Sequence, residues 1–203
     1  MPPRHAVTEA DIRDAARASR TLDLEAGAVV TPAARDLARA LGVALREAGG
    51  AAPPQQVVAL GADHGGYPMK EQLKGVLAES GYEVLDLGPH DAQPVDYPDY
   101  AVAVARAVAA GRAWRGIMID GAGIGSAMAA NKIAGVRAAL CYDLTTAQNA
   151  REHNDANVLT LGGTLIGTRL ATDIVRTFLS AAFGGGRHAR RVEKINALDT
   201  GRG

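Results

Sequence analysis

After about residue 56, short apolar runs alternate along the chain with longer stretches that carry apolar residues at helical spacing. Continuous short apolar runs are typical of strands buried on both faces of a parallel sheet, and the alternation predicts helices on both faces. The expected strands are residues 57–61, 83–88, 116–120, 136–141 and 157–162. The expected helices are residues 67–81, 98–111, 125–132, 143–152, 166–183 and 188–198. We therefore expect an α/β fold with a five-stranded parallel sheet.

The first 50 residues follow a different pattern, which predicts two short amphipathic helices. Thr8 and Thr31 are plausible N-cap residues for them. The stretch EAGGAAPPQQ indicates a linker, because its paired Gly, Ala and Pro residues interrupt regular structure. We expect a helical extension over 1–50, a linker over 51–56 and the main domain over 57–199. The two helices are too short to form a core of their own, so the extension is either a brace on the main domain or a second subunit, or a targeting segment.

Composition and charge exclude several classes of partner. The chain has 203 residues and equal numbers of acidic and basic side chains, 22 of each, which implies no general attraction to nucleic acid or to anionic membranes. No apolar stretch approaches the roughly 20 residues that span a bilayer, and the N-terminal residues lack a signal-peptide pattern. The single cysteine, Cys141, rules out an internal disulfide. These features fit a cytoplasmic protein with no nucleic-acid or membrane partner.

Candidate chemical groups lie at the ends of the predicted strands, where open parallel sheets bind ligands. Asp63 and His64 follow the first predicted strand, and Asp120 ends the third, directly before the glycine-rich loop GAGIG. His153 and Asn154 precede the fifth. Near the C-terminus, a run of glycines leads to arginines that can clamp a phosphate at a helix start, namely Arg187 and Arg191. No zinc-binding spacing and no Walker-type phosphate loop occur, so we expect no metal and no cofactor.

Five strings in this order, GADHGGYPMKEQL, VDYPDYA, GAGIGSAMAANKIAGVRAALCYD, AREHNDANVLTLGG and GGGRHARRVEKI, resemble the type B ribose-5-phosphate isomerase family, which includes the galactose-6-phosphate isomerase subunits. The resemblance covers roughly residues 56–199. It implies a Rossmann-like three-layer sandwich that assembles as a homodimer or a dimer of dimers, with residues of both subunits in each active site. It also implies that an aldose phosphate and a ketose phosphate interconvert through an enediolate, without a metal or organic cofactor.

The resemblance also implies roles for individual residues. The glycine loop supplies N–H donors that stabilise the enediolate oxygen, a task that fits Gly121, Gly123 and Gly125. The remaining matches are Asp63 and His64 as contacts to sugar and phosphate, Tyr97 in the pocket wall, His153 for ring opening, Asn154 for the hydroxyls or the enediolate, and Arg187 and Arg191 for the phosphate.

The chain departs from the family at two positions. Many members carry a cysteine base where this chain has Asp120, and others carry a glutamate base at the position of Ser126, which serine cannot replace. Asp120 is then either the base or a substrate-binding remnant in a protein whose isomerisation is lost or altered. Cys141 does not match the catalytic position. Thr164 stands where members often carry a phosphate-binding arginine, so the phosphate grip is expected to be weaker or placed elsewhere.

Three functions from different classes follow. The first is a sugar-phosphate isomerase, with ribose 5-phosphate and ribulose 5-phosphate as the foremost substrate pair and with tetrose phosphates, other pentose phosphates and hexose 6-phosphates open. The second is a non-catalytic sugar-phosphate binding or scaffold protein. The third, a nucleotide-dependent enzyme, is disfavoured because no acidic residue ends the strand after GAGIGS. Residues 1–50 also resemble segments that direct cargo into bacterial microcompartments, which implies shell proteins as partners.

Overall fold

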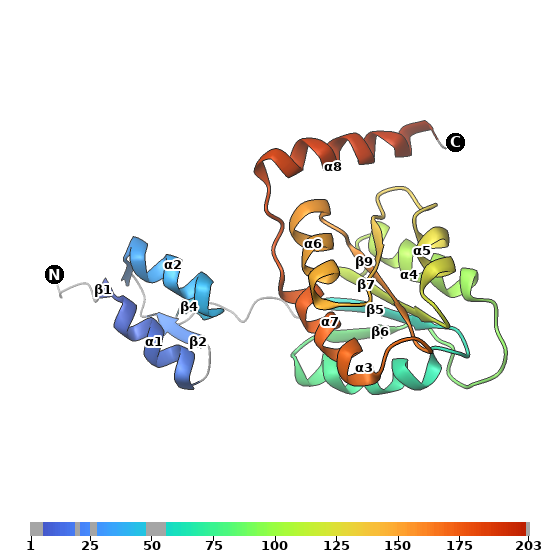
Figure 1. Cartoon of the computed structure of the whole chain (residues 1–203), viewed down its shortest axis with the longest axis horizontal. Helices are drawn as coiled ribbons and strands as arrows, with labels where there is room; N and C mark the ends of the chain where they lie inside the picture. Colours follow the sequence, from blue (N-terminus) through green and yellow to red (C-terminus); the bar gives the residue numbers. More distant parts are fainter. Residues whose placement is uncertain (1–5, 19–20, 25–27, 48–55, 202–203) are drawn as a thin grey trace. The chain divides into compact units, whose positions relative to one another are not determined.

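The computed structural model describes residues 6–18, 21–24, 28–47 and 56–201. The chain divides into two compact units, Met1–Pro54 and Gln55–Gly203 (Figure 1). The larger unit carries all of the candidate site residues, and the smaller one corresponds to the N-terminal extension.

The larger unit is built on a parallel sheet with the strand order β6-β5-β7-β9-β8. The strands are β5 (Val57–Ala62), β6 (Glu83–Asp86), β7 (Arg115–Asp120), β8 (Ala138–Leu140) and β9 (Val158–Gly162). All neighbouring pairs are parallel. The five strands predicted from the apolar runs are therefore confirmed, with ends that shift by no more than two residues.

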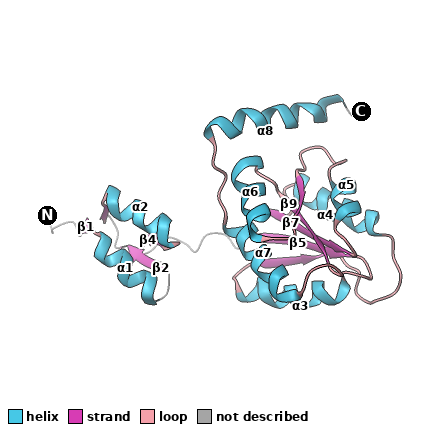
Figure 2. Ribbon diagram, in the orientation of Figure 1, coloured by secondary structure: helices cyan, strands magenta, loops and turns pink. Residues whose placement is uncertain are grey.

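Helices cover both faces of this sheet, which gives the expected three layers (Figure 2). Alternate residues of each strand point to opposite faces, so Leu60 packs on one side and Ala59 on the other. One face is covered by α3 (Tyr67–Glu79), α6 (Leu144–Asn154) and α7 (Thr168–Ser180). The other is covered by α4 (Tyr97–Ala109) and α5 (Ile124–Ala130).

The C-terminal segment continues beyond the sheet as η1 (Gly186–His188), α8 (Ala189–Asn196) and η2 (Ala197–Gly201). Two side-chain hydrogen bonds fasten it to the loop before β8. The Arg137 guanidinium donates to Asn196 Oδ1 at 2.9 Å, and the Gly135 N–H donates to Asp199 Oδ2 at 2.8 Å. The arginine-bearing segment therefore has a defined place on the larger unit. None of the helices in the described parts of the chain is long and apolar enough to cross a membrane.

The N-terminal unit contains the two expected helices, α1 (Glu9–Ala18) and α2 (Pro32–Leu41). The predicted cap of α2 forms, because Thr31 Oγ1 accepts from the Ala34 N–H. At the start of α1, the Thr8 N–H and hydroxyl both donate to Asp11. Between the helices and at their ends lie four short strands that the sequence pattern did not predict. These are β1 (Ala6–Val7), β2 (Thr21–Leu24), β3 (Val29–Val30) and β4 (Ala44–Glu47).

The expectation that this extension has no core of its own is wrong. β1 pairs with β3 and β2 with β4, both in parallel and both joining residues 23 positions apart, as in Ala6 with Val29 and Thr21 with Ala44. The unit is thus a strand–helix–strand motif repeated twice. The paired strands bring the apolar faces of both helices together, and Ile12 and Ala34 are completely buried. The predicted linker, apart from Gln56, lies outside the described residues.

Candidate active site

The carboxyl ends of the three central strands bring the first group of candidate residues together. Asp63 follows β5, Asp120 ends β7, and Gly163 follows β9. Backbone hydrogen bonds join the three ends: the Asp63 N–H donates to the Ile119 carbonyl at 3.0 Å, and the Gly163 N–H donates to the Asp120 carbonyl at 2.7 Å. These two aspartates therefore lie on neighbouring strands at the edge where such sheets bind ligands.

The carboxylate of Asp120 is turned back onto the glycine loop that follows it. Oδ1 accepts hydrogen bonds from the N–H groups of Ala122, at 2.9 Å, and Gly123. Oδ2 accepts from the Ser126 N–H at 3.1 Å and from the Ser126 hydroxyl at 2.5 Å. Gly123 can close this loop because its φ is +80° and because a Cβ there would lie 2.5 Å from Leu140.

This geometry weighs against Asp120 as the proton acceptor. A carboxylate offers about four lone-pair sites for hydrogen bonds. The four hydrogen bonds described above occupy those of Asp120. The N–H of Gly123, expected to face the substrate, donates to Asp120 instead. The partnership with Ser126 was not predicted, although an aspartate just before a helix start is a common acceptor for first-turn N–H groups. The arrangement makes Asp120 the organiser of the loop, and its role as base stays a prediction.

Asp63 is buried too, but its carboxylate has far fewer partners. Oδ1 accepts one hydrogen bond, from the Gly66 N–H at 2.8 Å. Within the described residues, Oδ2 accepts none. Gly66 lets this loop lie against β7, because a Cβ there would be 2.1 Å from the Ile119 carbonyl oxygen. Next to it, Nδ1 of His64 lies 3.3 Å from both the backbone N and O of Val95.

Tyr97 lies against the same loop from α4. A Cβ on Gly125 would be 2.5 Å from the Tyr97 hydroxyl, so glycine leaves room for the ring. Two further residues, neither predicted as site residues, fix the loop carbonyls: Thr164 Oγ1 donates to Gly121 O at 2.6 Å, and the Tyr142 hydroxyl donates to Ala122 O at 2.6 Å. Thr164, which stands in place of a family arginine, therefore holds the loop.

The second group of candidate residues lies elsewhere, where α6 ends and β9 begins. The ring of His153 stacks on His188, with centroids 4.2 Å apart, and its Nδ1 lies 2.9 Å from the Asn149 amide. Arg187 Nε lies 3.4 Å from His188 Nε2. Desolvation and the nearby positive groups His153, Arg187 and Arg191 lower the pKa of His188. This gathering of cationic side chains suits a phosphate.

The two groups lie at opposite edges of the sheet. Asn154 ends α6 just before β9, at the amino edge, whereas Asp120 and Thr164 lie at the carboxyl edge. The five residues of β9 alone separate these edges by about 16 Å. No hydrogen bond or ring contact joins the groups in the part of the chain that the structure describes. One copy of the chain therefore does not bring all eleven predicted residues into a single site.

Two alternative centres are not supported. Burial raises the pKa of the Cys141 thiol to about 11, so this thiol carries little thiolate near neutral pH. The described residues include no group of three or more His, Cys, Asp or Glu side chains arranged to hold a metal ion.

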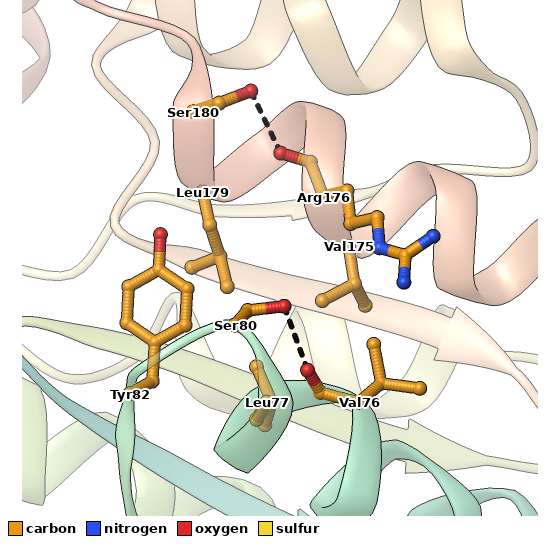
Figure 3. A pocket seen from close by; sticks show the side chains of 8 residues that line it. All are labelled: Val76, Leu77, Ser80, Tyr82, Val175, Arg176, Leu179 and Ser180. Carbon is orange, nitrogen blue, oxygen red and sulfur yellow. Dashed lines mark hydrogen bonds between the residues drawn. The ribbon is translucent and has the colours of Figure 1, made fainter. Parts of the chain in front are cut away.

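A pocket between α3 and α7 holds none of the predicted site residues (Figure 3). Leu77, Val175 and Leu179 form part of its wall. Its two serine hydroxyls donate to carbonyl groups of their own helices, Ser80 to Val76 at 2.7 Å and Ser180 to Arg176 at 2.8 Å. The polar groups needed for sugar chemistry are instead those at the sheet edges.

Comparison with known proteins gives a consistent result. A model of the ribose/galactose isomerase family matches residues 58–195. Ribose-5-phosphate isomerase B of Escherichia coli K12 is 46% identical over 142 residues, which are 70% of this chain and 95% of that protein. D-erythrulose-4-phosphate isomerase of Pectobacterium atrosepticum is 41% identical over 140 residues, or 68% of this chain and 91% of that protein.

Solved structures agree. Ribose-5-phosphate isomerase B of Clostridium thermocellum superimposes with a TM-score of 0.72 at 48% identity, covering 73% of this chain and 100% of that one. The Mycoplasma genitalium protein of the same name, solved with bound ribulose 5-phosphate, has a TM-score of 0.68 at 40% identity, covering 71% and 96%. The family match begins at residue 58, so the N-terminal unit lies outside it.

Proposed function

The chain belongs to the ribose/galactose isomerase family and is a sugar-phosphate isomerase, and from this premise we propose that it interconverts ribose 5-phosphate and ribulose 5-phosphate in sites shared by two copies of the chain. The observation that carries the proposal is the division of the site residues between the two edges of the sheet. One edge holds the carboxylates and the glycine loop, and the other holds the histidine and the arginines.

Each half-site supplies a different part of the reaction. At the carboxyl edge, a carboxylate takes the proton from the carbon beside the carbonyl, and loop N–H groups stabilise the oxygen that becomes negative. At the amino edge of the second copy, His153 exchanges a proton with the ring oxygen as the sugar opens. Arg187 and Arg191 hold the phosphate there, and Asn154 contacts the hydroxyls. Tyr97 and His64 complete the wall of the first half-site.

The relatives support a small sugar phosphate as substrate, and they differ in the sugar. One is named for ribose 5-phosphate and another for erythrulose 4-phosphate. Thr164 of this chain is uncharged and donates to the glycine loop. It therefore supplies no positive charge to a phosphate. We therefore take the five-carbon sugar as the first substrate and the four-carbon sugar as its closest competitor.

The direct test is hydrogen exchange at the carbon beside the carbonyl. Ribose 5-phosphate, erythrose 4-phosphate and a hexose 6-phosphate are incubated with the protein in deuterated water, and NMR follows deuterium uptake and the isomer ratio. We expect uptake and isomerisation with ribose 5-phosphate at the highest rate. Free ribose serves as the control without phosphate and is expected to react far more slowly. If none of the phosphates exchanges, the chain binds sugar phosphates without turning them over.

A further inference from the structure

The two buried aspartates at the carboxyl edge differ in how their oxygens are used. Asp120 accepts four hydrogen bonds from its own loop, whereas Asp63 accepts one. Asp63 is 7% exposed, and its Oδ2 accepts no hydrogen bond in the described part of the chain. A proton acceptor needs such a free lone pair within reach of the substrate.

Asp63 also lies beside a free N–H donor. Gly65 stands between them: a Cβ on it would be 3.3 Å from Asp63 Oδ1 and 3.6 Å from the Gly121 N. Because residue 65 is glycine, no side chain separates the Asp63 carboxylate from the Gly121 N–H. The Gly121 N–H donates no hydrogen bond to any described residue, unlike the N–H groups of Ala122 and Gly123. The strand end therefore presents a carboxylate and an N–H donor close to each other, the two groups that removal of a proton beside a carbonyl requires.

We propose that Asp63 is the base that removes the proton from C2 of the sugar phosphate, and that Asp120 positions the loop. The proposal rests on the isomerase function stated above. In the aldose, the C2–H bond breaks and its proton moves to Asp63. The electron pair of that bond forms the C1–C2 double bond, and the π pair of the C1 carbonyl moves onto O1, beside the Gly121 N–H. Return of the proton to C1, with transfer of the O2 proton to O1, gives the ketose.

The neighbouring groups differ from Asp63 in burial or in hydrogen bonding. His64 is exposed, and its Nδ1 lies against the Val95 backbone. Cys141 has a raised pKa and a buried side chain, and it lies one strand beyond the site residues, at the end of β8. Asp120 would have to give up hydrogen bonds from the very loop that it organises before it could accept a proton. Asp63 needs no such rearrangement, because its Gly66 contact uses the other oxygen.

The test compares Asp63→Asn with Asp120→Asn in the full-length protein. Asparagine keeps an oxygen that can accept from the Gly66 N–H, so Asp63→Asn is expected to keep the wild-type melting temperature. We expect it to lower kcat and the C2 deuterium exchange of ribose 5-phosphate by about 10²–10⁴-fold, the usual contribution of a positioned acid–base group. Titration calorimetry should show that the variant still binds ribose 5-phosphate. Asp63→Glu should recover part of the exchange.

Asp120→Asn is expected to behave differently, because its amide nitrogen cannot accept from Ser126. It should lower the melting temperature and raise KM, with residual exchange clearly above that of Asp63→Asn. Asp173→Asn, which changes a half-exposed aspartate on α7 that pairs with the exposed Arg169, is the control for the substitution itself and should match the wild type. Exchange by Asp63→Asn within tenfold of wild type would overturn the inference while leaving the isomerase function in place. Absence of exchange in the wild type with every sugar phosphate would overturn both.

Discussion

Lys70 is completely buried on α3, and its ammonium group depends on the partners around it. It donates to both oxygens of Asp86, at 2.8 and 3.0 Å, and to the Pro89 carbonyl at 2.8 Å. These contacts tie α3 to the start of the loop between β6 and α4. The same loop carries Val95 to His64 and leads into Tyr97. A buried ion pair therefore positions one wall of the candidate site.

This pair predicts a pH dependence of stability. Burial opposes ionisation of Asp86, but hydrogen bonds from Lys70, Lys74 and the Gly88 N–H outweigh it and lower the pKa of Asp86 to about 2. A carboxyl whose pKa is lower in the folded state stabilises the fold above its unfolded-state pKa, near 4, and that contribution disappears as the pH falls toward 2. We expect Asp86→Asn to destabilise the protein at pH 7, because the completely buried Lys70 then keeps only the more exposed Glu71, at 2.9 Å, as a carboxylate partner.

Urea unfolding of the wild type and Asp86→Asn between pH 7 and pH 2 measures this effect. The difference in unfolding free energy should be largest above pH 4 and should shrink toward pH 2. Asp91→Asn, which changes an exposed aspartate in the following loop, is the matched control and should show no such trend. A difference that stays constant over the whole range would mean that ionised Asp86 is not what stabilises this loop.

At the scale of elements, the N-terminal unit is the least expected part of the chain. Its four strands are two to four residues long, too short to show a period of two in the sequence. It has its own buried core, which favours an independent module over a brace. We propose that this unit is a targeting module, in line with its resemblance to microcompartment cargo segments. The enzyme would then work in the cytoplasm or inside such a compartment.

Removal of residues 1–54 tests the role of this module. The remaining chain should keep its melting temperature and its isomerase rate within about twofold, because the isomerase fold is complete without it. Co-assembly with microcompartment shell proteins, measured by co-sedimentation, should be lost. The untruncated chain is the reference in both measurements. A lower melting temperature with unchanged co-assembly would favour a stabilising role for residues 1–54 and would contradict the targeting role.

For the whole molecule, the two half-sites lie about one strand length apart, and this separation is the basis of the proposal that a second copy completes each site. Mixed dimers test this arrangement. His153→Ala and Asp63→Ala change different half-sites, so each pure variant is expected to be inactive. A mixed dimer would contain one intact site and one site with both changes.

Random mixing of the two inactive variants should therefore restore about a quarter of the wild-type activity, as symmetric dimers with shared sites require. The variants are denatured and refolded together, and ribulose 5-phosphate formation is measured. Two preparations of the same variant, mixed in the same way, are the control. No recovery of activity from well-folded mixtures would contradict shared sites.

Much of the larger unit follows from local pattern alone. The apolar runs fixed β5, β7 and β9 because burial on both faces leaves a continuous signal in neighbouring residues. Asp63 and Asp120 were then candidates because they lie at the carboxyl ends of two predicted strands. In a parallel sheet these ends share one edge, and ligands bind there. Thr31 and Pro32 likewise predicted the start of α2, because caps depend on a few adjacent residues.

The tertiary structure decided what these residues can do. Whether the lone pairs of Asp120 face a substrate or its own loop depends on the backbone path through Gly123, which residue types do not specify. The placement of His153 at the opposite edge follows from the direction of α6 between β8 and β9. The sequence by itself therefore determined the family, the elements of the larger unit and the chemical groups. The path of the chain in space determined which carboxylate oxygens are occupied by hydrogen bonds and which candidate residues lie at the same edge of the sheet.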